Sequence, residues 1–341
     1  MAEYNINQQF TLLERAKRST DGKKILPILD VMDQRGVPDF LRDVPYFPAN
    51  QGLKHRIIRT ASRPTSTRRV FYGGVGRTIT TTQVVYENVV LFEQRSEIDE
   101  DALDTIENPK EARRQEDEGH IAGIQEDFVN AVFNDALTSG GAEYINGFAA
   151  RLNALSFPGG ATTTLPFVWD GGASATRTSL YIIEWGPKAN HCLYPSGIAG
   201  KGGMFGIIAR NKGREKITEA SSSLDVYYGY VSQFKKWGGL AVNDQRKLAR
   251  IANINATAGG ANDLDENLLI RALNHGRFDP RSTRIYVNPY LKSQIDIRAK
   301  DKGNVQWDIK DVFGKPVPTF WSIPIRVLDE NIITASESAV A

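Results

Sequence analysis

The sequence has a single cysteine, only four histidines and almost no net charge over its 341 residues. Cys192 alone cannot close an internal disulfide, and no cysteines and histidines have the spacing of a zinc site. A formal net charge of +2 gives no overall reason to expect nucleic-acid binding. These absences exclude disulfide-stapled scaffolds and zinc modules, and they do not name a function.

Long apolar runs are also missing. No segment approaches the roughly 20 apolar residues of a membrane-spanning helix, and the first residues do not have a basic-then-apolar signal peptide. With 41% hydrophobic and 24% charged residues, the composition is that of a globular protein. The length suits about two domains. We therefore expect a protein that is soluble and intracellular when made, with no membrane partner.

Catalytic patterns are absent as well. The four histidines lie far apart, and none has the spacing of a helical zinc site. Residues 197–202 lack the first glycine and the Ser/Thr of a phosphate-binding loop, and no helix is expected after the glycines at 73–76. The acids in 97–107 lack the ligand spacing of an EF-hand loop. The sequence therefore predicts no enzyme, no cofactor and no metal site, although a cytosolic α/β enzyme stays as an alternative.

The N-terminal part does not have the pattern of a compact domain. Apolar positions within 10–16 and 25–32 predict short helical pieces, and Pro38, Pro45 and Pro48 favour extended backbone. We predict that residues 1–50 form an arm that docks on another structure.

Residues 51–92 are rich in β-branched side chains. The runs 55–60, 68–72 and 78–92 predict strands around the glycine turn at 73–76. The segment has too few apolar residues for a core of its own, and an isolated hairpin is only marginally stable in water. We therefore expect this hairpin to lie on a neighbouring structure.

The small net charge hides a basic stretch followed by an acidic one. Between Val44 and Tyr86 there are seven basic residues and no acidic residue, whereas acids dominate from 93 to 118. Each stretch is either a solvated face or part of a contact with the other.

Residues 109–138 predict a long helix. Asn108 is a suitable N-cap, Pro109 suits the first helical position, and Glu111 completes a capping box. The glycines at 140 and 141 would end the helix after about 45 Å. Apolar residues recur on one stripe at Ile121, Ile124, Phe128, Val132 and Ala136. The first half is highly charged, so only the second half can bury a strong apolar face.

The remainder is mixed α/β with glycine-rich loops. Strands are predicted at 178–185, 192–194, 227–234, 240–242 and 284–287. Helices are predicted at 263–274 and after Pro289, and the tail 316–333 is strand-like but broken by prolines, as on edge strands.

Three features carry a resemblance to a known family. They are the run 184–197 (EWGPKANHCLYPSG), the runs 239–246 (GLAVNDQR) and 250–254 (RIANI), and the order of parts up to the strand 321–326 (WSIPIR). Together they resemble major capsid proteins of tailed bacteriophages with the Hong Kong-97-type fold.

The resemblance implies an α+β fold with five parts. These are an N-terminal arm (1–50), an extended loop (51–92), a peripheral domain with the spine helix (93–150), an axial domain (151–315) and a C-terminal strand segment (316–341). The implied function is structural: self-assembly into hexamers and pentamers of an icosahedral head around double-stranded DNA. An encapsulin-like nanocompartment shell is the alternative.

The resemblance also implies partners and contacts. Besides copies of itself, the subunit would meet portal and scaffolding proteins, a decoration protein and packaged DNA, in the host bacterial cytoplasm during assembly and then in the virion. With a short arm, we expect a separate scaffold or none. In this fold the extended loop lies over the peripheral domain of an adjacent subunit. The candidate contact residues are Arg63, Arg68, Arg69 and Arg77 on the loop and Glu107, Glu111, Glu116 and Asp117 on the neighbour.

Overall fold

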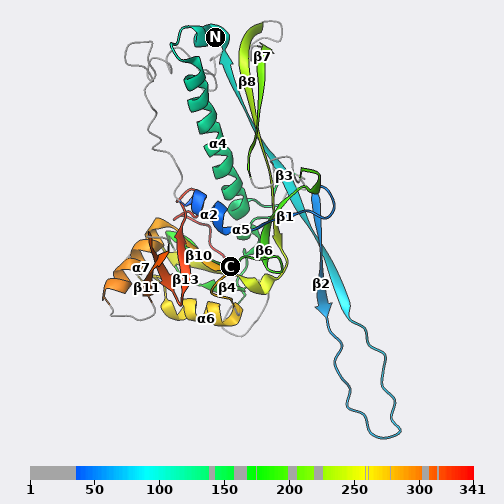
Figure 1. Ribbon diagram of the computed structural model, residues 1–341. Coiled ribbons are helices and arrows are strands. Elements are labelled where there is room, and N and C mark those ends of the chain that lie inside the picture. Colours follow the sequence, from blue (N-terminus) through cyan, green and yellow to red (C-terminus); the bar gives the residue numbers. More distant parts are fainter. Residues whose placement is uncertain are drawn as a thin grey trace.

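The computed structural model describes residues 36–137, 143–156, 167–173, 175–198, 206–218, 226–257, 259, 261–276, 278–301, 307–312 and 315–341. The helical pieces predicted within residues 1–35 lie outside this part of the chain. The described protein has three visible parts: a long helix lying along a sheet, a compact lobe and a projecting hairpin (Figure 1).

One sheet is built around two very long strands. Its spatial order is β1 (Tyr46–Pro48), β6 (Asn190–Tyr194), β8 (Val226–Val242), β3 (Thr81–Asp99) and β2 (Lys54–Ser62), with β7 (Ile208–Thr218) also paired to β8. The first half of β3 pairs with β2, and its second half pairs with β8. A single 19-residue strand therefore joins the hairpin to the body.

The second sheet forms the lobe. Its order is β11 (Trp307–Val312), β12 (Lys315–Phe320), β13 (Ile323–Val327), β10 (Thr283–Val287), β5 (Arg177–Glu184), β9 (Leu248–Asn255) and β4 (Phe167–Asp170). Helices α6 (Glu266–Gly276) and α7 (Pro289–Asp301) lie beside it (Figure 1). Apolar side chains from the sheet and both helices, including Leu180, Ile251, Leu269 and Leu291, form one buried core.

The long helix α4 (Pro109–Asn134) confirms the predicted spine in its burial. Its second half buries Phe128, Val129, Val132 and Phe133, whereas the first three turns bury only Ala112. The helix can lie close to β8 because residue 238 is glycine: a Cβ there would come within 2.2 Å of the Phe128 ring. The absence of a side chain at Gly238 thus lets the Phe128 ring of α4 pack directly on the backbone of β8.

The predicted start of this helix, with Asn108 at the N-cap and Pro109 at the first helical position, is confirmed, whereas the capping box and the predicted end are wrong. The Asn108 side chain makes no capping hydrogen bond, and Glu111 pairs with Arg114 instead. The helix ends at Asn134 and not at 138, because the chain at 145–147 folds back over its end. There the Ile145 N–H donates to the Asp135 carboxylate and the Gly147 N–H to the Asp135 carbonyl.

Three further local predictions were wrong. Pro38 lies in the first turn of α2 (Val37–Asp43), where proline is tolerated, and the helix is held by Phe40, which is fully buried. The run 68–72 is not a strand, because the β2–β3 ladder stops at Ser62 and Thr81. The two strands predicted within 227–242 are the single strand β8.

The other predicted elements are confirmed within a few residues. β2, β5, β6, β10 and α7 match their predicted positions, and α6 starts slightly later than predicted. The short helices α3 (Glu100–Asp104) and α5 (Phe148–Arg151) and the 3-10 turns η3 (Ser196–Ile198) and η4 (Gln245–Lys247) complete the described elements.

The end of the chain is bonded to the sheet of the lobe and to the segment that follows α5. The Ala341 carbonyl accepts from the Leu155 N–H, and the Asn253 amide bonds both backbone groups of Val340. The Arg250 side chain donates to Glu337 at 2.8 Å, to Ser179 at 2.9 Å and to the Leu152 carbonyl at 2.8 Å.

Candidate intersubunit surfaces

The hairpin has two unlike faces near its root, by which we mean residues 54–59 of β2 and 84–89 of β3, where it joins the body. Because side chains alternate along strands, Ile57, Val85 and Val89 point to the body, where they pack with Leu193 and Ala241. The opposite face exposes Ile58, Val84 and Tyr86, and Ile58 pairs directly with Val84. This outward face is a two-stranded apolar surface with nothing covering it in the described part of the chain.

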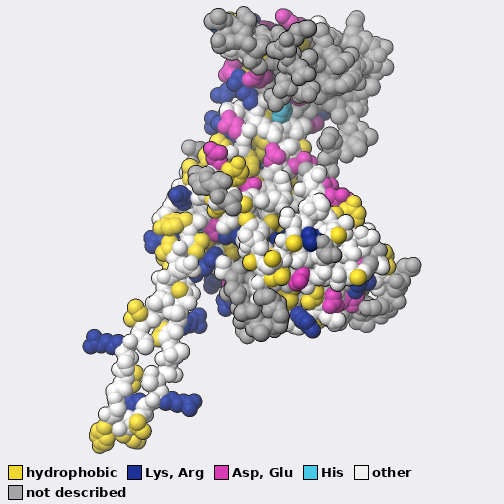
Figure 2. Space-filling view, turned by 180° about the vertical axis from the view of Figure 1, so that it is seen from behind, with side chains coloured by type: hydrophobic (Ala, Val, Ile, Leu, Met, Phe, Trp, Pro, Cys, Tyr) yellow, Lys and Arg dark blue, Asp and Glu magenta, His cyan; other side chains and the backbone are white. Residues whose placement is uncertain are grey.

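The loop beyond the ladder is exposed at every residue except Gly73, which is half-buried. Residues 63–80 contain no helix or strand, and a turn near the end is closed by a hydrogen bond from the Gly73 N–H to the Val70 carbonyl at 3.1 Å. Phe71 is 91% exposed, and Val70, Tyr72, Val75 and Ile79 are exposed beside it. Figure 2 shows this apolar loop end far from the body.

The candidate arginines all lie on this loop. Arg63, Arg68, Arg69 and Arg77 are exposed, and none has an ion-pair partner among the described residues. Basic side chains project from the loop on both sides (Figure 2). They are free to meet another chain.

The candidate acids differ in their surroundings. Asp117 faces β8, where the Ser232 hydroxyl donates to it at 3.4 Å, and burial raises the pKa of its carboxyl. Glu116 lies 3.7 Å from His120, and Glu111 accepts two hydrogen bonds from Arg114, which lower its pKa. Glu107 is exposed, with no ion-pair partner in the described ranges. The structure thus makes Glu107 the most available of the four.

The arginines and the acids cannot meet within one subunit. The loop leaves the start of β3, and the acids follow its end (Figure 1). Nineteen strand residues at about 3.4 Å each separate the two groups by roughly 60 Å. Any contact between these basic and acidic stretches must therefore join different subunits.

Buried charges, which sequence patterns did not single out, fix the root of the loop. Glu87 is 1% exposed and accepts two hydrogen bonds from the Arg151 guanidinium, at 2.9 and 2.5 Å. Arg59 donates to the carbonyls of Val242 and Asn243 at the end of β8. The only sequence signal was that Glu87 is the first acid after the acid-free stretch.

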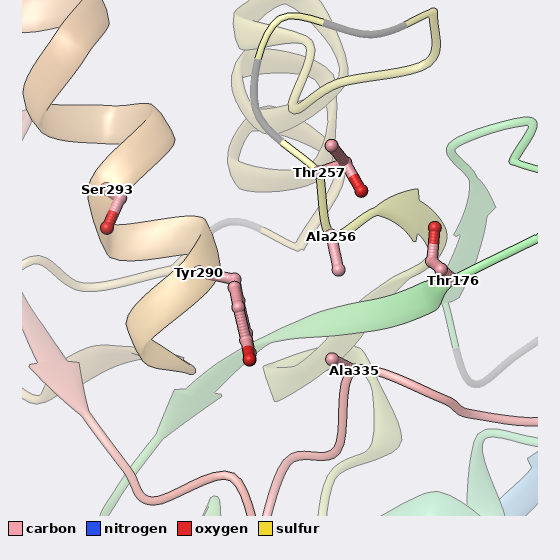
Figure 3. Close-up of a pocket in the computed structure, with 6 residues that line it drawn as sticks. All are labelled: Thr176, Ala256, Thr257, Tyr290, Ser293 and Ala335. Carbon is pink, nitrogen blue, oxygen red and sulfur yellow. The ribbon is translucent and has the colours of Figure 1, made fainter.

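Two pockets are lined by residues that the structure describes. A pocket of about 370 Å³ beside α7 is lined by Thr176, Ala256, Thr257, Tyr290, Ser293 and Ala335 (Figure 3). Among these described residues there is no carboxylate, imidazole or thiol. A second hollow, of about 420 Å³, lies between α4 and β7 and is lined largely by charged side chains, including Arg113 and Glu118.

Metal and membrane features are likewise missing from the described residues. They contain no group of three or more potential metal-ligating side chains. None of their helices is both long and apolar enough to span a membrane.

Comparison with known proteins gives one family. The model of the family "Major capsid protein GP7" matches residues 20–341. No curated protein matches the chain.

Solved structures give the fold. The structure of bacteriophage Epsilon15 is similar with a TM-score of 0.72 and 22% identity over 100% of both chains. The bacteriophage JBD30 capsid has a TM-score of 0.45 and 11% identity over 84% of this chain and 89% of that one. The SrpI encapsulin of Synechococcus elongatus PCC 7942 has a TM-score of 0.42 and 11% identity over 71% and 94%.

Proposed function

Because the chain belongs to the major capsid protein GP7 family, we propose that its copies form hexamers and pentamers of an icosahedral head around double-stranded DNA. The chain is a structural component of a tailed-phage virion, with the α+β Hong Kong-97-type fold. The family match favours this function over the encapsulin-like alternative and over a cytosolic enzyme, and we propose no catalytic activity.

The observation that carries the proposal is the uncovered hairpin. The hairpin has an apolar outward face, an apolar end and four unpaired arginines, and none of these has a stabilising partner among the residues that the structure describes. A hairpin of this kind needs another surface for its stability. Many identical copies in a shell would supply that surface.

Burial would supply most of the strength of this contact. Full burial of one large apolar side chain contributes about 1.5–3 kcal/mol, and the hairpin exposes several, including Ile58, Phe71 and Tyr72. Exposed ion pairs contribute little individually, so the arginines would set register and specificity.

The neighbour's acidic stretch is the proposed partner of the arginines. Glu107 and Glu111 are the better candidates, because Asp117 faces β8 within its own subunit and Glu116 lies near His120. The hairpin of one subunit would then lie over the start of α4 in the next.

A charge-reversal series tests this pairing. Arg68→Glu with Arg69→Glu should leave a folded subunit that assembles only at a several-fold higher concentration, and Glu107→Lys with Glu111→Lys should partly restore assembly. The matched control is Arg271→Glu with Arg281→Glu, an equal charge change at exposed positions of the lobe. Assembly is followed by light scattering and negative-stain microscopy. Normal assembly of the loop variant at low salt, where screening is weak, would contradict the pairing.

We also propose that the chain is divided into an arm, a loop, a peripheral domain, an axial domain and a C-terminal segment. The two sheets do not follow the boundaries of these parts, since β8 lies within 151–315 but pairs with residues 89–99 of β3, which belong to 51–92 and 93–150. Portal, scaffolding and decoration proteins are proposed partners, and the host cytoplasm is the proposed place of assembly. Mass spectrometry of purified particles would identify proteins that stay bound.

A further inference from the structure

Two histidines meet where the hairpin joins the body. The imidazole rings of His55 in β2 and His191 in β6 lie 5.8 Å apart between centroids and are nearly perpendicular, at 87°. Phe47 packs on His191 at 4.9 Å from another direction. His191 is 3% exposed, whereas His55 is half-buried. The contact therefore spans the junction between the projecting hairpin and the sheet beneath it.

Burial outweighs the few groups that stabilise a positive charge on these rings: a backbone hydrogen bond with Gly186 raises the pKa of His191, and the charge of Glu87 raises the pKa of His55, yet both pKa values lie below the ordinary one. The Nδ1 atoms of both histidines are buried and have no hydrogen-bond partner among the described residues. The charged groups nearby are already committed. Glu87 is held by Arg151, the Arg59 guanidinium is bonded to two carbonyls, and Asp244 is paired with Arg246.

We propose that the contact between His55 and His191 is an acid-sensitive latch that holds the root of the extended loop against the body. At neutral pH the two uncharged rings pack together with Phe47. When both rings carry a proton, two like charges face each other in a closed site with no free carboxylate. The root of the hairpin then separates from the sheet beneath it, and the extended loop no longer has a fixed orientation relative to the body.

The direction of the pH effect follows from burial. Desolvation lowers the pKa of His191 to about 4 and also lowers the pKa of His55, although the nearby Glu87 partly opposes the shift at His55. An opened root exposes histidine with its ordinary pKa of about 6.5 and so binds protons more readily. The closed root is therefore fully stable above pH 6.5 and loses stability as the pH falls from 6.5 towards 4. By linkage, His191 alone favours opening by roughly 30-fold at pH 5 relative to pH 8.

Hydrogen exchange on the full-length subunit tests the latch. Protection factors, corrected for intrinsic exchange, should fall by at least about tenfold between pH 7.5 and pH 5 for the root amides of β2 and β3. The strands β5 and β9 of the lobe serve as the internal reference and should keep their protection. Unchanged root protection, or an equal loss in root and lobe, would overturn the latch.

Variants at the half-exposed His55 separate the latch from general acid sensitivity. His55→Gln should weaken the pH dependence of root protection, and His55→Lys, which carries a permanent charge against His191, should lower it already at pH 7.5. His120→Gln, at a histidine on α4 outside the root, is the control and should behave as the unmodified protein. Full pH dependence in His55→Gln combined with His191→Gln would assign the effect to other groups. Because the measurement uses the unassembled subunit, it is independent of whether the loop contacts a neighbour.

Discussion

The hairpin and the lobe use the same secondary structure with opposite burial. In the lobe, all but the end residues of β5 are buried, and so are all but the last of β9. In the hairpin, β2 buries only Ile57 fully, and beyond the ladder the apolar side chains of Val70, Phe71, Tyr72, Val75 and Ile79 are all exposed. The lobe therefore contains its own core, whereas the apolar surface of the hairpin is left uncovered by the described part of the chain.

The largest contrast should come from removing one phenylalanine in each region. Phe133 is fully buried at the junction of α4 and the lobe, where its ring contacts those of Phe40, Phe148, Tyr181 and Tyr286. Phe133→Ala should lower the free energy of unfolding by about 3–5 kcal/mol because it leaves a cavity. Urea denaturation of the isolated subunit measures this loss.

Phe71→Ala is the matched change at the loop end. Because Phe71 is almost fully exposed, the free energy of unfolding should change by no more than about 0.5 kcal/mol, while the concentration needed for assembly should rise. Equal destabilisation by the two substitutions would show that the loop is packed within its own subunit.

A smaller effect is expected where the two regions join. Glu87→Gln leaves the Arg151 guanidinium, of which 10% is exposed, without its countercharge, and should cost about 3 kcal/mol. Glu97→Gln, in the more exposed pair with Arg95, should cost below about 1 kcal/mol. Thermal and urea denaturation of both variants compare the two pairs. A negligible loss in Glu87→Gln would mean that the root is held by packing alone.

The smallest expected effect concerns a covalent tie on the loop. Lys54, at the base of the hairpin, is the only lysine in 51–92, so no amine lies near the loop end. Particles boiled in denaturant should run as single subunits on a gel, and Lys54→Arg should leave the pattern unchanged. Ladders of linked subunits that disappear in Lys54→Arg would contradict this prediction and would show that the loop is held by a covalent cross-link through Lys54.

Much of the fold was predictable where the pattern was local. The strand 284–287 and the helix after Pro289, the charged first half of α4 and the basic hairpin followed by acids all follow from neighbouring residues. The run 184–197 and its companions led to the capsid family, which the family match confirms. The predicted contacts between arginines and acids stay a prediction, because they lie between subunits.

By itself, the sequence determined the family, the α+β character, the charge division and most element positions. These features depend on periodicity, turn residues and motifs, each of which involves only residues close together in the sequence. Only the tertiary structure decided where α4 ends, since chain at 145–147 closes it, and why Pro38 lies in a helix, since Phe40 is buried there. It alone brought His55 to His191 and Glu87 to Arg151. Those pairs join segments that are far apart in the sequence, which no local pattern encodes.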